Sequence, residues 1–394
     1  MRKFIEPFVV APIASQQIED ETTSYFDEAG QLLAEANTHD GQLYLAVFYG
    51  TNEQPPITKQ ELEAIIKQVQ HVFELEQLVV ESMEQEDGGW AVSLKMQEPK
   101  FNVLVPSSGM TITISDTGFV KAVTVSDNDF EILYPDKLIS KEEARAILQR
   151  QSLLQLGIIP ELGWQYGYKQ NHDLYGLSAD GTPRLWSNEE FMQGVTYEAL
   201  PEVEELASFE AFLQGGRAEP VRFEQLEHEQ YWVIPSDERI CLDEDGFMRA
   251  CRVVKSLVGQ HYDSYLIEHV PALERQNHTH KAYRFIYQFE GISFEFQAIS
   301  ITVRSDTNQI MSISYTPMAF DTFLNLQPPT ISLEEANQIA QHLVDVELYL
   351  ENDVENRKKL SFVYLITYPT SPTGGHIQYV EGFTGEIHWV ETGW

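Results

Sequence analysis

The strongest constraint on this chain is internal repetition. One strand–turn–strand pattern, I-T-I-S-D-T-G-F-V-K-A-V-T-V, occupies residues 112–125. It recurs as I-C-L-D-E-D-G-F-M-R-A-C-R-V at residues 240–253 and, more loosely, as I-T-V-R-S-D-T-N-Q-I-M-S-I-S at residues 301–314. A second pattern, I-S-x-E-E-A, begins at Ile139 and again at Ile331. Repetition on this scale indicates duplicated supersecondary units, so the chain is predicted to fold as repeats.

All three copies of the first pattern are predicted to be β-hairpins. Gly118 and Gly246 occupy equivalent turn positions, where a positive φ is expected, and Asn308 stands at that place in the third copy. The two cysteines of the chain, Cys241 and Cys251, would lie at the two ends of the second hairpin. A disulfide across that hairpin is geometrically possible, and the sequence leaves it open.

The second pattern is typical of a helix start. Ser140 and Ser332 are predicted N-caps, each followed three residues later by the Glu of a capping box. Thr58 and Glu61 form a third such pair, which opens a helix predicted to run to about residue 75. Alternating or continuous apolar runs predict further strands at residues 43–49, 90–96, 102–105, 359–368 and 378–390.

Length and pattern together predict more than one domain. The chain has 394 residues, of which 43% are hydrophobic, and single cores stop growing near roughly 250–300 residues. Hairpins combined with helices favour the α+β class, as duplicated units of an antiparallel β-sheet with one covering helix. The expected division is an N-terminal strand-containing segment (1–56), a first repeat unit (57–200), a linker (201–220) and a second repeat unit (221–394).

The net charge and the hydropathy of the chain exclude some classes of binding partner and indicate a cellular location. The formal net charge is −35, and such a chain repels nucleic acids and anionic lipid, which need a basic face. We find no stretch near the roughly 20 apolar residues of a membrane span. Glu6, Pro7 and Pro12 interrupt the apolar run at the N-terminus, where a secretory signal needs an unbroken one. The sequence therefore predicts an intracellular, cytoplasmic protein.

Motifs of common enzymes and metal sites are missing from the sequence, which has no P-loop, H-E-x-x-H, G-x-S-x-G or C-x-x-C pattern. His278 and His280, with His261 and His269 upstream, are interpreted as surface residues because polar neighbours surround the pair. The acidic run at 243–246 is interpreted as a hairpin turn, since it lacks the later acidic ligand of a calcium loop. We therefore predict no catalytic residue, no cofactor and no metal site.

Two pairs of adjacent glutamates could be either helix-capping residues or paired catalytic carboxylates. The pairs at 142–143 and 334–335 stand in the first turn of predicted helices, where acids complement the helix dipole. A capping role explains them better than paired acid–base carboxylates.

One aromatic group leaves two interpretations open. Trp164, Tyr166 and Tyr168 alternate at period two, followed by Tyr175, so three of these rings are expected on one face of a strand. The rings can pack a core. Alternatively, they can form a peptide-binding face, because aromatic side chains concentrate at the energetic centres of interfaces.

Several of these motifs resemble a known family. The run I-S-L-E-E-A-N-Q-I-A from Ile331, followed by Y-V-E-G-F-T-G-E-I at 379–387, resembles the PepSY domain, whose pattern is an I-S-x-E-E-A helix and a D-x-x-T-G-E-I hairpin. The longer run from Y-R-F-I-Y at 283–287 through I-T-V at 301–303 and Asp306 is similar to the YcdB/YcdC repeated domain of Firmicutes. The resemblance covers roughly residues 90–190 and 240–394.

The chain also departs from that family. Its third hairpin has N-Q-I at 308–310 in place of the family's G-E-I turn, and it shows no signal peptide, which members usually carry. The resemblance implies a PepSY-like or cystatin-like fold. PepSY-type domains are associated with propeptides and peptidase regulation, so it also implies a binding or inhibitory module, and it carries over no catalytic residue.

We therefore expect a non-enzymatic binding or regulatory protein with a peptide or protein target and a peptidase-inhibitor-like role, offering a sheet edge for strand addition. One alternative is an enzyme of unrecognised type that uses a cleft between the two halves. Another is an acidic, immunity-like partner of a basic protein, suggested by the net charge.

Overall fold

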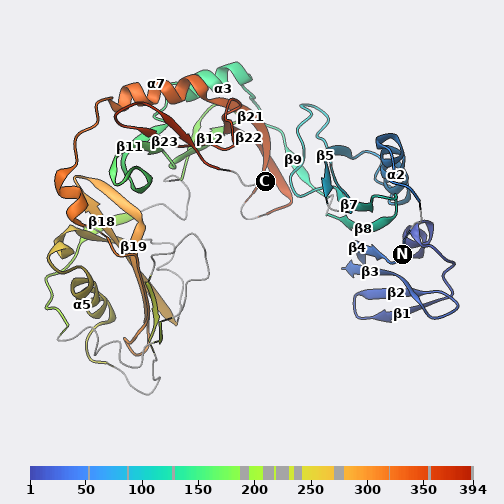
Figure 1. Cartoon of the computed structure of the whole chain (residues 1–394), viewed down its shortest axis with the longest axis horizontal. Helices are drawn as coiled ribbons and strands as arrows, with labels where there is room; N and C mark the ends of the chain where they lie inside the picture. The colour runs from blue at the N-terminus through green and yellow to red at the C-terminus, as the bar shows by residue number, and fades with distance from the viewer. Residues whose placement is uncertain are drawn as a thin grey trace. The chain divides into compact units, whose positions relative to one another are not determined.

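The computed structural model describes residues 1–51, 54–86, 88–126, 129–186, 195–206, 217–218, 230–234, 242–269, 279–318, 320–353 and 356–391. The protein belongs to the α+β class, as predicted, and its sheets are mostly antiparallel with a few helices (Figure 1). It forms two compact units. Unit 1 comprises Met1–Leu138 and Leu348–Tyr364, and unit 2 comprises Ile139–Glu347 and Leu365–Trp394.

One order of elements, a helix followed by four strands, occurs four times in the described residues. The first copy is α2 (Lys59–Val72), β5 (Val79–Glu86), β6 (Gly89–Lys95), β7 (Met110–Ser115) and β8 (Val120–Val125). The second is α3 (Lys141–Leu148), β10 (Leu154–Ile159), β11 (Gln165–Gln170), β12 (Leu174–Ser178) and β13 (Pro183–Leu185). The third is α5 (Gly246–Val258), β17 (Tyr265–His269), β18 (His280–Phe289), β19 (Ile292–Arg304) and β20 (Ile310–Tyr315). The fourth is α7 (Leu333–Leu343), β21 (Asp345–Asn352), β22 (Lys359–Thr367), β23 (Ile377–Glu381) and β24 (Ile387–Trp389). Each of the two predicted repeat units therefore contains two copies.

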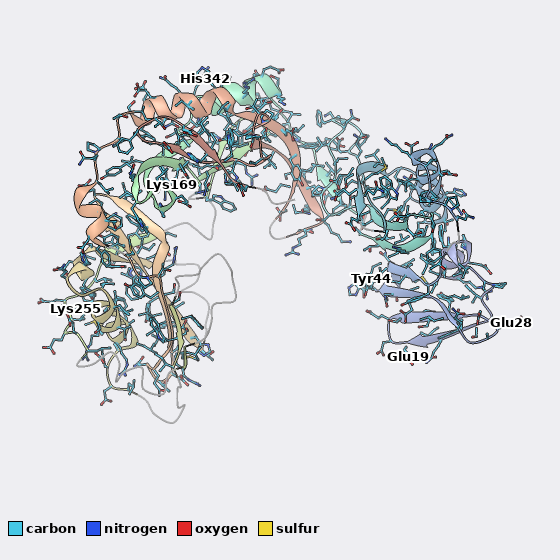
Figure 2. The ribbon with its side chains drawn as sticks, in the orientation of Figure 1. Glu19, Glu28, Tyr44, Lys169, Lys255 and His342 are labelled. Atoms are coloured by element: carbon cyan, nitrogen blue, oxygen red, sulfur yellow. The ribbon has the colours of Figure 1, made fainter. Side chains whose placement is uncertain are left out.

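Unit 1 contains an eight-stranded antiparallel sheet in the order β1-β2-β3-β4-β8-β7-β6-β5. Its N-terminal strands are β1 (Ser15–Glu19), β2 (Thr22–Phe26), β3 (Leu32–His39) and β4 (Gln42–Phe48). The helix α2 buries Leu62 and Val69 in a core shared with Ile112 of β7. The edge strand β1 is exposed at all five positions, and Glu19 at its end is labelled in Figure 2. Beside this sheet, β9 (Glu131–Leu133) pairs in parallel with β22.

Unit 2 contains a seven-stranded sheet in the order β14-β17-β18-β19-β20-β16-β15. Its outer strands are β14 (Thr196–Ala199), β15 (Arg217–Ala218) and β16 (Gln230–Val233). The helix α5 packs on β18, β19 and β20. Ala250 and Val254 of α5 are fully buried in one core with Phe285 and Ile301 of the sheet. A helix lying on one face of an antiparallel sheet buries the apolar side of both, which is the predicted arrangement.

A four-stranded sheet in unit 2 joins two copies in the order β10-β11-β23-β24. The first hairpin of the second copy thus pairs with the last hairpin of the fourth copy. Their helices are linked reciprocally: Gln149 Nε2 donates to the Gln341 carbonyl (3.1 Å), and Gln341 Nε2 donates to the Gln151 carbonyl (3.0 Å). Gln149 and Gln341 are 192 residues apart, as are Ile139 and Ile331, so equivalent residues of the two copies meet here.

Every copy closes on itself in the same way. The backbone N–H of a residue shortly before the helix donates to a carbonyl in the turn of that copy's last hairpin. The four pairs are Ile57 to Asp116 (2.8 Å), Ile139 to Ala179 (3.0 Å), Leu242 to Thr307 (2.9 Å) and Ile331 to Gly382 (3.1 Å). Each turn also contains one residue with a positive φ: Gly118 (83°), Gly181 (93°), Asn308 (56°) and Gly385 (75°).

Most of the local predictions are confirmed. Thr58, Ser140 and Ser332 are N-caps, each with both hydrogen bonds of a capping box. The hairpins at 112–125 and 301–314 form as β7–β8 and β19–β20, and Gly118 and Asn308 have the expected positive φ. The prediction of a strand at 102–105 is wrong, because that segment makes an isolated bridge between Gln97 and Leu104.

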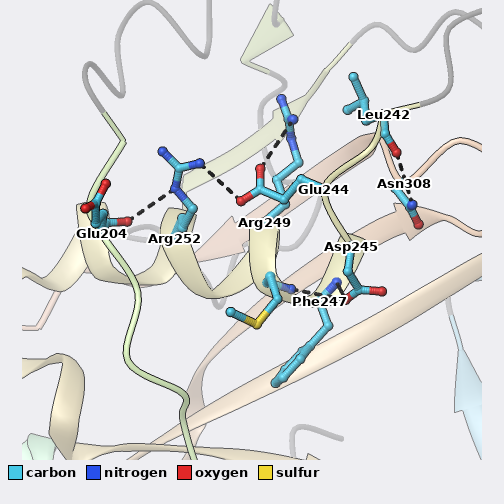
Figure 3. A network of polar contacts seen from close by, with 9 residues as sticks. Glu204, Leu242, Glu244, Asp245, Phe247, Arg249, Arg252 and Asn308 are labelled. Atoms are coloured by element: carbon cyan, nitrogen blue, oxygen red, sulfur yellow. Dashed lines mark hydrogen bonds and ion pairs between the residues drawn. The ribbon is translucent and has the colours of Figure 1, made fainter.

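The predicted second hairpin is also wrong. Residues 246–253 form the first part of α5. Asp245 caps this helix, and its side chain accepts hydrogen bonds from the N–H groups of Phe247 and Met248 (Figure 3). The buried residues Ala250, Val254 and Val258 recur every four positions, which is the spacing of one face of a helix. This periodicity favours a helix, although the segment resembles the hairpin pattern in sequence.

Glycine at 246 was predicted to provide a positive φ in a hairpin turn, but the structure requires it for a steric reason. It is not among the residues with positive φ. A Cβ at this position would lie 2.6 Å from Val303 Cγ1 of β19, so glycine allows the helix start to approach the sheet. Cys251 lies buried in α5 as a free thiol, and Cys241 is outside the described residues. The geometry assumed for a disulfide across a hairpin is absent, because Cys251 stands in a helix.

The predicted linker, 201–220, is partly outside the described residues. Its described segment 201–206 docks on α5: Lys255 Nζ donates to the Val203 carbonyl (2.6 Å), and the Leu206 N–H donates to Ser256 Oγ (2.9 Å). Arg252 joins the same region, since its guanidinium contacts the Glu204 carbonyl and the Glu244 carboxylate (Figure 3). The two compact units divide the chain at other points than this segment.

We predict that Gly118→Val lowers the free energy of unfolding by more than about 1 kcal/mol. The substitution must hold a β-branched residue at a φ of 83°, and its Cβ would lie 3.0 Å from Ile57 and 3.1 Å from Ile65. Gly30→Val is the matched control, because Gly30 has a φ of 81° with no atom within 4 Å of its Cβ. Urea unfolding should show a larger loss for Gly118→Val. Equal losses would contradict the contribution of the two isoleucines.

Asn337 provides a second test. Its Oδ1 accepts hydrogen bonds from the backbone N–H groups of Leu153 (2.7 Å) and Leu154 (3.0 Å), so this buried side chain joins α7 to β10. Asn337→Ala should cost about 1–3 kcal/mol of unfolding free energy, because buried donors lose their acceptor. Gln338→Ala on the exposed side of α7 should change stability little. Thermal unfolding of both variants measures the difference.

Candidate functional site

A pocket in unit 2 is the candidate site. It has a volume of about 590 Å³, within the size range of small-ligand pockets. Four structural parts form its walls: β10, β11, the turn between β18 and β19, and the segment around and after the 3-10 helix η6 (Phe320–Asn325). The lining residues are Leu156, Tyr166, Phe289, Glu290, Ile292, Phe323, Leu326, Pro328 and Pro329.

A tight hairpin turn brings Glu290 to the pocket. Phe289 pairs with Ile292, which leaves Glu290 and Gly291 as a two-residue turn. Both have positive φ, 48° and 82°, as a type I′ turn requires, and this turn matches the twist of the flanking strands. The side chain of Glu290 therefore extends from a two-residue hairpin turn.

The opposite wall depends on a close approach of three segments. The N–H of Gly382 donates to the Tyr166 carbonyl (3.3 Å), which holds the end of β23 against β11. A Cβ at Gly382 would lie 2.6 Å from that carbonyl oxygen and 2.9 Å from Pro329 Cβ. Glycine at 382 thus lets the proline-containing connector lie beside β11.

The polar centre of the pocket is one tyrosine–carboxylate pair. The hydroxyl of Tyr166, a residue only 7% exposed, donates to Glu290 Oε2 at 2.8 Å. Burial, together with this hydrogen bond, raises the pKa of Tyr166 to about 12. The tyrosine therefore stays protonated and donates at neutral pH. An ionised carboxylate has acceptor sites beyond the one this bond uses, so Glu290 can accept from a further donor.

The structure separates the three aromatic residues selected from the sequence. Tyr166 lines the pocket, whereas Tyr168 is 2% exposed and donates to the Ile331 carbonyl at the start of α7. Trp164 has a φ of 64° and precedes β11, and its half-buried ring packs on Phe323 (5.6 Å between centroids). The three rings therefore do not form one exposed face, and Tyr166 is the member that reaches the pocket.

Sequence reasoning missed the other half of the site. The E-G dipeptide at 290–291, between two apolar-rich segments, is a recognisable hairpin-turn signal. It does not reveal that Glu290 meets Tyr166, a residue 124 positions away. Pro328 and Pro329, which also line the pocket, carry no functional signal in the sequence.

The other described residues considered from the sequence lie outside the pocket. Glu143 and Glu335 cap α3 and α7, as interpreted. His280 is exposed at the start of β18, and His278 lies outside the described residues. A sheet edge suitable for strand addition is present in unit 1, where β1 is exposed throughout and Ile18 is 64% exposed.

Comparisons with known proteins give little more. No family model matches the chain, and no curated protein matches it. Among solved structures, the chain is similar to the Bacillus megaterium YpeB C-terminal domain, with a TM-score of 0.30 and 10% identity, over 80% of this chain and 94% of that one. So distant a likeness carries no argument about function, and membership of the YcdB/YcdC family stays a prediction.

None of the described helices combines the length and the apolar character needed to cross a bilayer.

We predict that Tyr166→Phe destabilises the protein in a pH-dependent way. Because the pKa of Tyr166 rises on folding from 10 to about 12, its contribution to stability is complete below pH 10 and is lost as the pH approaches 12. The stability gap between parent and variant should therefore be largest at pH 9 or below and should shrink between pH 10 and pH 12. Urea titrations across this range measure the gap. A gap that stays constant to pH 12 would show that Tyr166 ionises alike in the folded and unfolded states.

Proposed function

We propose that this chain is a non-enzymatic binding protein, and that the pocket of unit 2 receives a segment of a peptide or protein. The observation that carries the proposal is the composition of the pocket: apolar, aromatic and proline side chains surround a single carboxylate, Glu290, which a buried tyrosine holds in place. Recognition sites commonly combine an apolar wall with a few fixed polar groups.

The chemistry of the pocket favours binding over catalysis. Its ionisable lining residues are Glu290 and Tyr166, and the Tyr166 hydroxyl donates a hydrogen bond to the Glu290 carboxylate. A tyrosine with a pKa near 12 is poorly matched to proton transfer at neutral pH. General acid–base work needs a group poised near the working pH, whereas a fixed carboxylate is suited to holding a cation.

The lining residues also indicate the ligand class. Glu290 can accept hydrogen bonds from a lysine or arginine side chain or from an amino terminus. Leu156, Phe289 and Pro328 offer apolar surface to the neighbouring residue of the ligand, and Leu156 is 38% exposed. A basic residue beside an apolar one is therefore the expected recognition element. A regulatory role towards a peptidase, implied by the PepSY resemblance, belongs to the same proposal.

A second candidate function rests on the overall charge. A net charge of −35 favours association with a basic protein through long-range attraction. Such binding is screened by salt, whereas a pocket contact at short range is screened less. The two candidates therefore predict different salt dependence.

The test is a selection of short random peptides displayed on phage against the full chain at moderate salt. Peptides with a basic residue next to an apolar one should be enriched. Their affinity should fall at least roughly tenfold with Glu290→Gln, because a charge-assisted hydrogen bond is lost. Leu156→Ser should have a similar effect, because it removes an apolar contact to the residue beside the basic one. Glu142→Gln, an exposed acid in the first turn of α3, is the matched control and should change affinity less than twofold.

Two outcomes would contradict the pocket. One is the failure to enrich any peptide class on the parent chain. The other is enrichment that Glu290→Gln and Leu156→Ser leave unchanged. Binding of basic peptides that disappears on adding salt, with no effect of either variant, would favour the charge-driven candidate.

A further inference from the structure

The last hairpin of unit 2 gathers an imidazole and two carboxylates on one face. Glu381 ends β23, Glu386 immediately precedes β24, and His388 stands within β24. One ligand atom from each of the three residues lies within 4.8 Å of the other two. The pocket lining includes none of them.

One edge of this triangle already has the spacing of metal ligands. His388 Nε2 and Glu381 Oε1 are 3.0 Å apart. Zinc holds nitrogen and oxygen ligands at about 2.0–2.2 Å, which places neighbouring ligand atoms roughly 3–3.5 Å from each other. Glu386 is exposed, so rotation of its side chain can close the third position.

The charges at this face point to a cation. The N–H of Glu381 donates to the Glu386 carbonyl (2.9 Å), so two acidic residues face each other across an antiparallel pair, which is destabilising when nothing neutralises them. The ring of Tyr379 lies on the same face, beside His388. His388 Nε2 lies 3.0 Å from Glu381 Oε1 on this face.

Neighbouring groups orient two of the three ligands. Thr384 Oγ1 donates to Glu381 Oε2 (2.7 Å), which leaves Oε1 directed at His388. The ring of Tyr379 stacks on His388 with 4.4 Å between centroids and 19° between planes. Contacts of this kind around metal ligands fix their orientation and raise affinity for the ion.

We propose that Glu381, Glu386 and His388 bind one divalent transition-metal ion of the zinc class, with water completing the coordination. Imidazole with carboxylates suits zinc and its neighbours, whereas magnesium and calcium prefer oxygen ligands alone. The site is independent of the peptide pocket. No metal site was predicted from the sequence, where Glu381 and Glu386 belong to a hairpin-turn motif.

The test is calorimetric titration of the full chain with ZnCl2, after treatment with EDTA and dialysis. The parent should bind one zinc ion per chain at this site. His388→Ala and Glu381→Gln should each weaken binding at least tenfold, and Thr384→Val, which removes an orienting contact, should weaken it roughly tenfold. With Co²⁺ in place of zinc, the visible absorption of the bound ion should be lost in His388→Ala.

The controls are matched to the ligands. His342→Ala removes an exposed histidine on the outer side of α7 (Figure 2), and Glu334→Gln removes an exposed acid in the first turn of that helix; both should bind zinc as the parent does. Thermal unfolding without metal shows whether each variant is folded, and His388→Gln replaces His388→Ala if the latter is not. A parent that binds no zinc, or zinc affinity unchanged in His388→Gln and Glu381→Gln, would overturn the proposal.

Discussion

The contact between a helix start and the turn of the last hairpin is the interaction on which each copy depends. A helix leaves its first N–H groups without intrahelical partners, and here the preceding backbone donates to the turn while a capping side chain serves the helix itself. In the first, second and fourth copies, the turn contains a glycine, and two isoleucines eight residues apart lie against it. Ile57 and Ile65 do so at Gly118. At Gly118 and Gly181 a Cβ would crowd these isoleucines, so backbone conformation and packing select the same residue; at Gly385 the positive φ alone favours glycine.

The copies then combine in two ways, and the second creates the candidate site. The first and third copies keep their four strands in one sheet. The second copy instead pairs β11 with β23 of the fourth, and Gln149, Gln341 and Asn337 join their helices and strands. This pairing brings Gly382 beside Tyr166. The pocket is complete because the third copy supplies Glu290 from its own hairpin turn.

The two proposed sites use negative charge differently. In the pocket, a single carboxylate stands among apolar side chains and a neutral tyrosine holds it, an arrangement suited to one cationic group of a ligand. On the β23–β24 hairpin, two carboxylates and an imidazole lie within 4.8 Å of one another, an arrangement suited to a metal ion. The net charge of −35 says only that the protein is acidic. The local geometry distinguishes the two uses.

The sequence by itself determined what depends on neighbouring residues: the three capping boxes, the hairpins at 112–125 and 301–314, and the left-handed positions Gly118 and Asn308. Each follows from hydrogen bonds or sterics within a few residues. Residues 240–253 resemble the hairpins in sequence, but residues 246–253 begin α5. Asp245 caps this helix, and its apolar residues recur every four positions and pack on β19. The pairing of copies, the Tyr166–Glu290 contact across 124 residues and the approach of Gly382 to Pro329 were decided by the tertiary structure. Such contacts join residues whose local sequences carry no signal of each other.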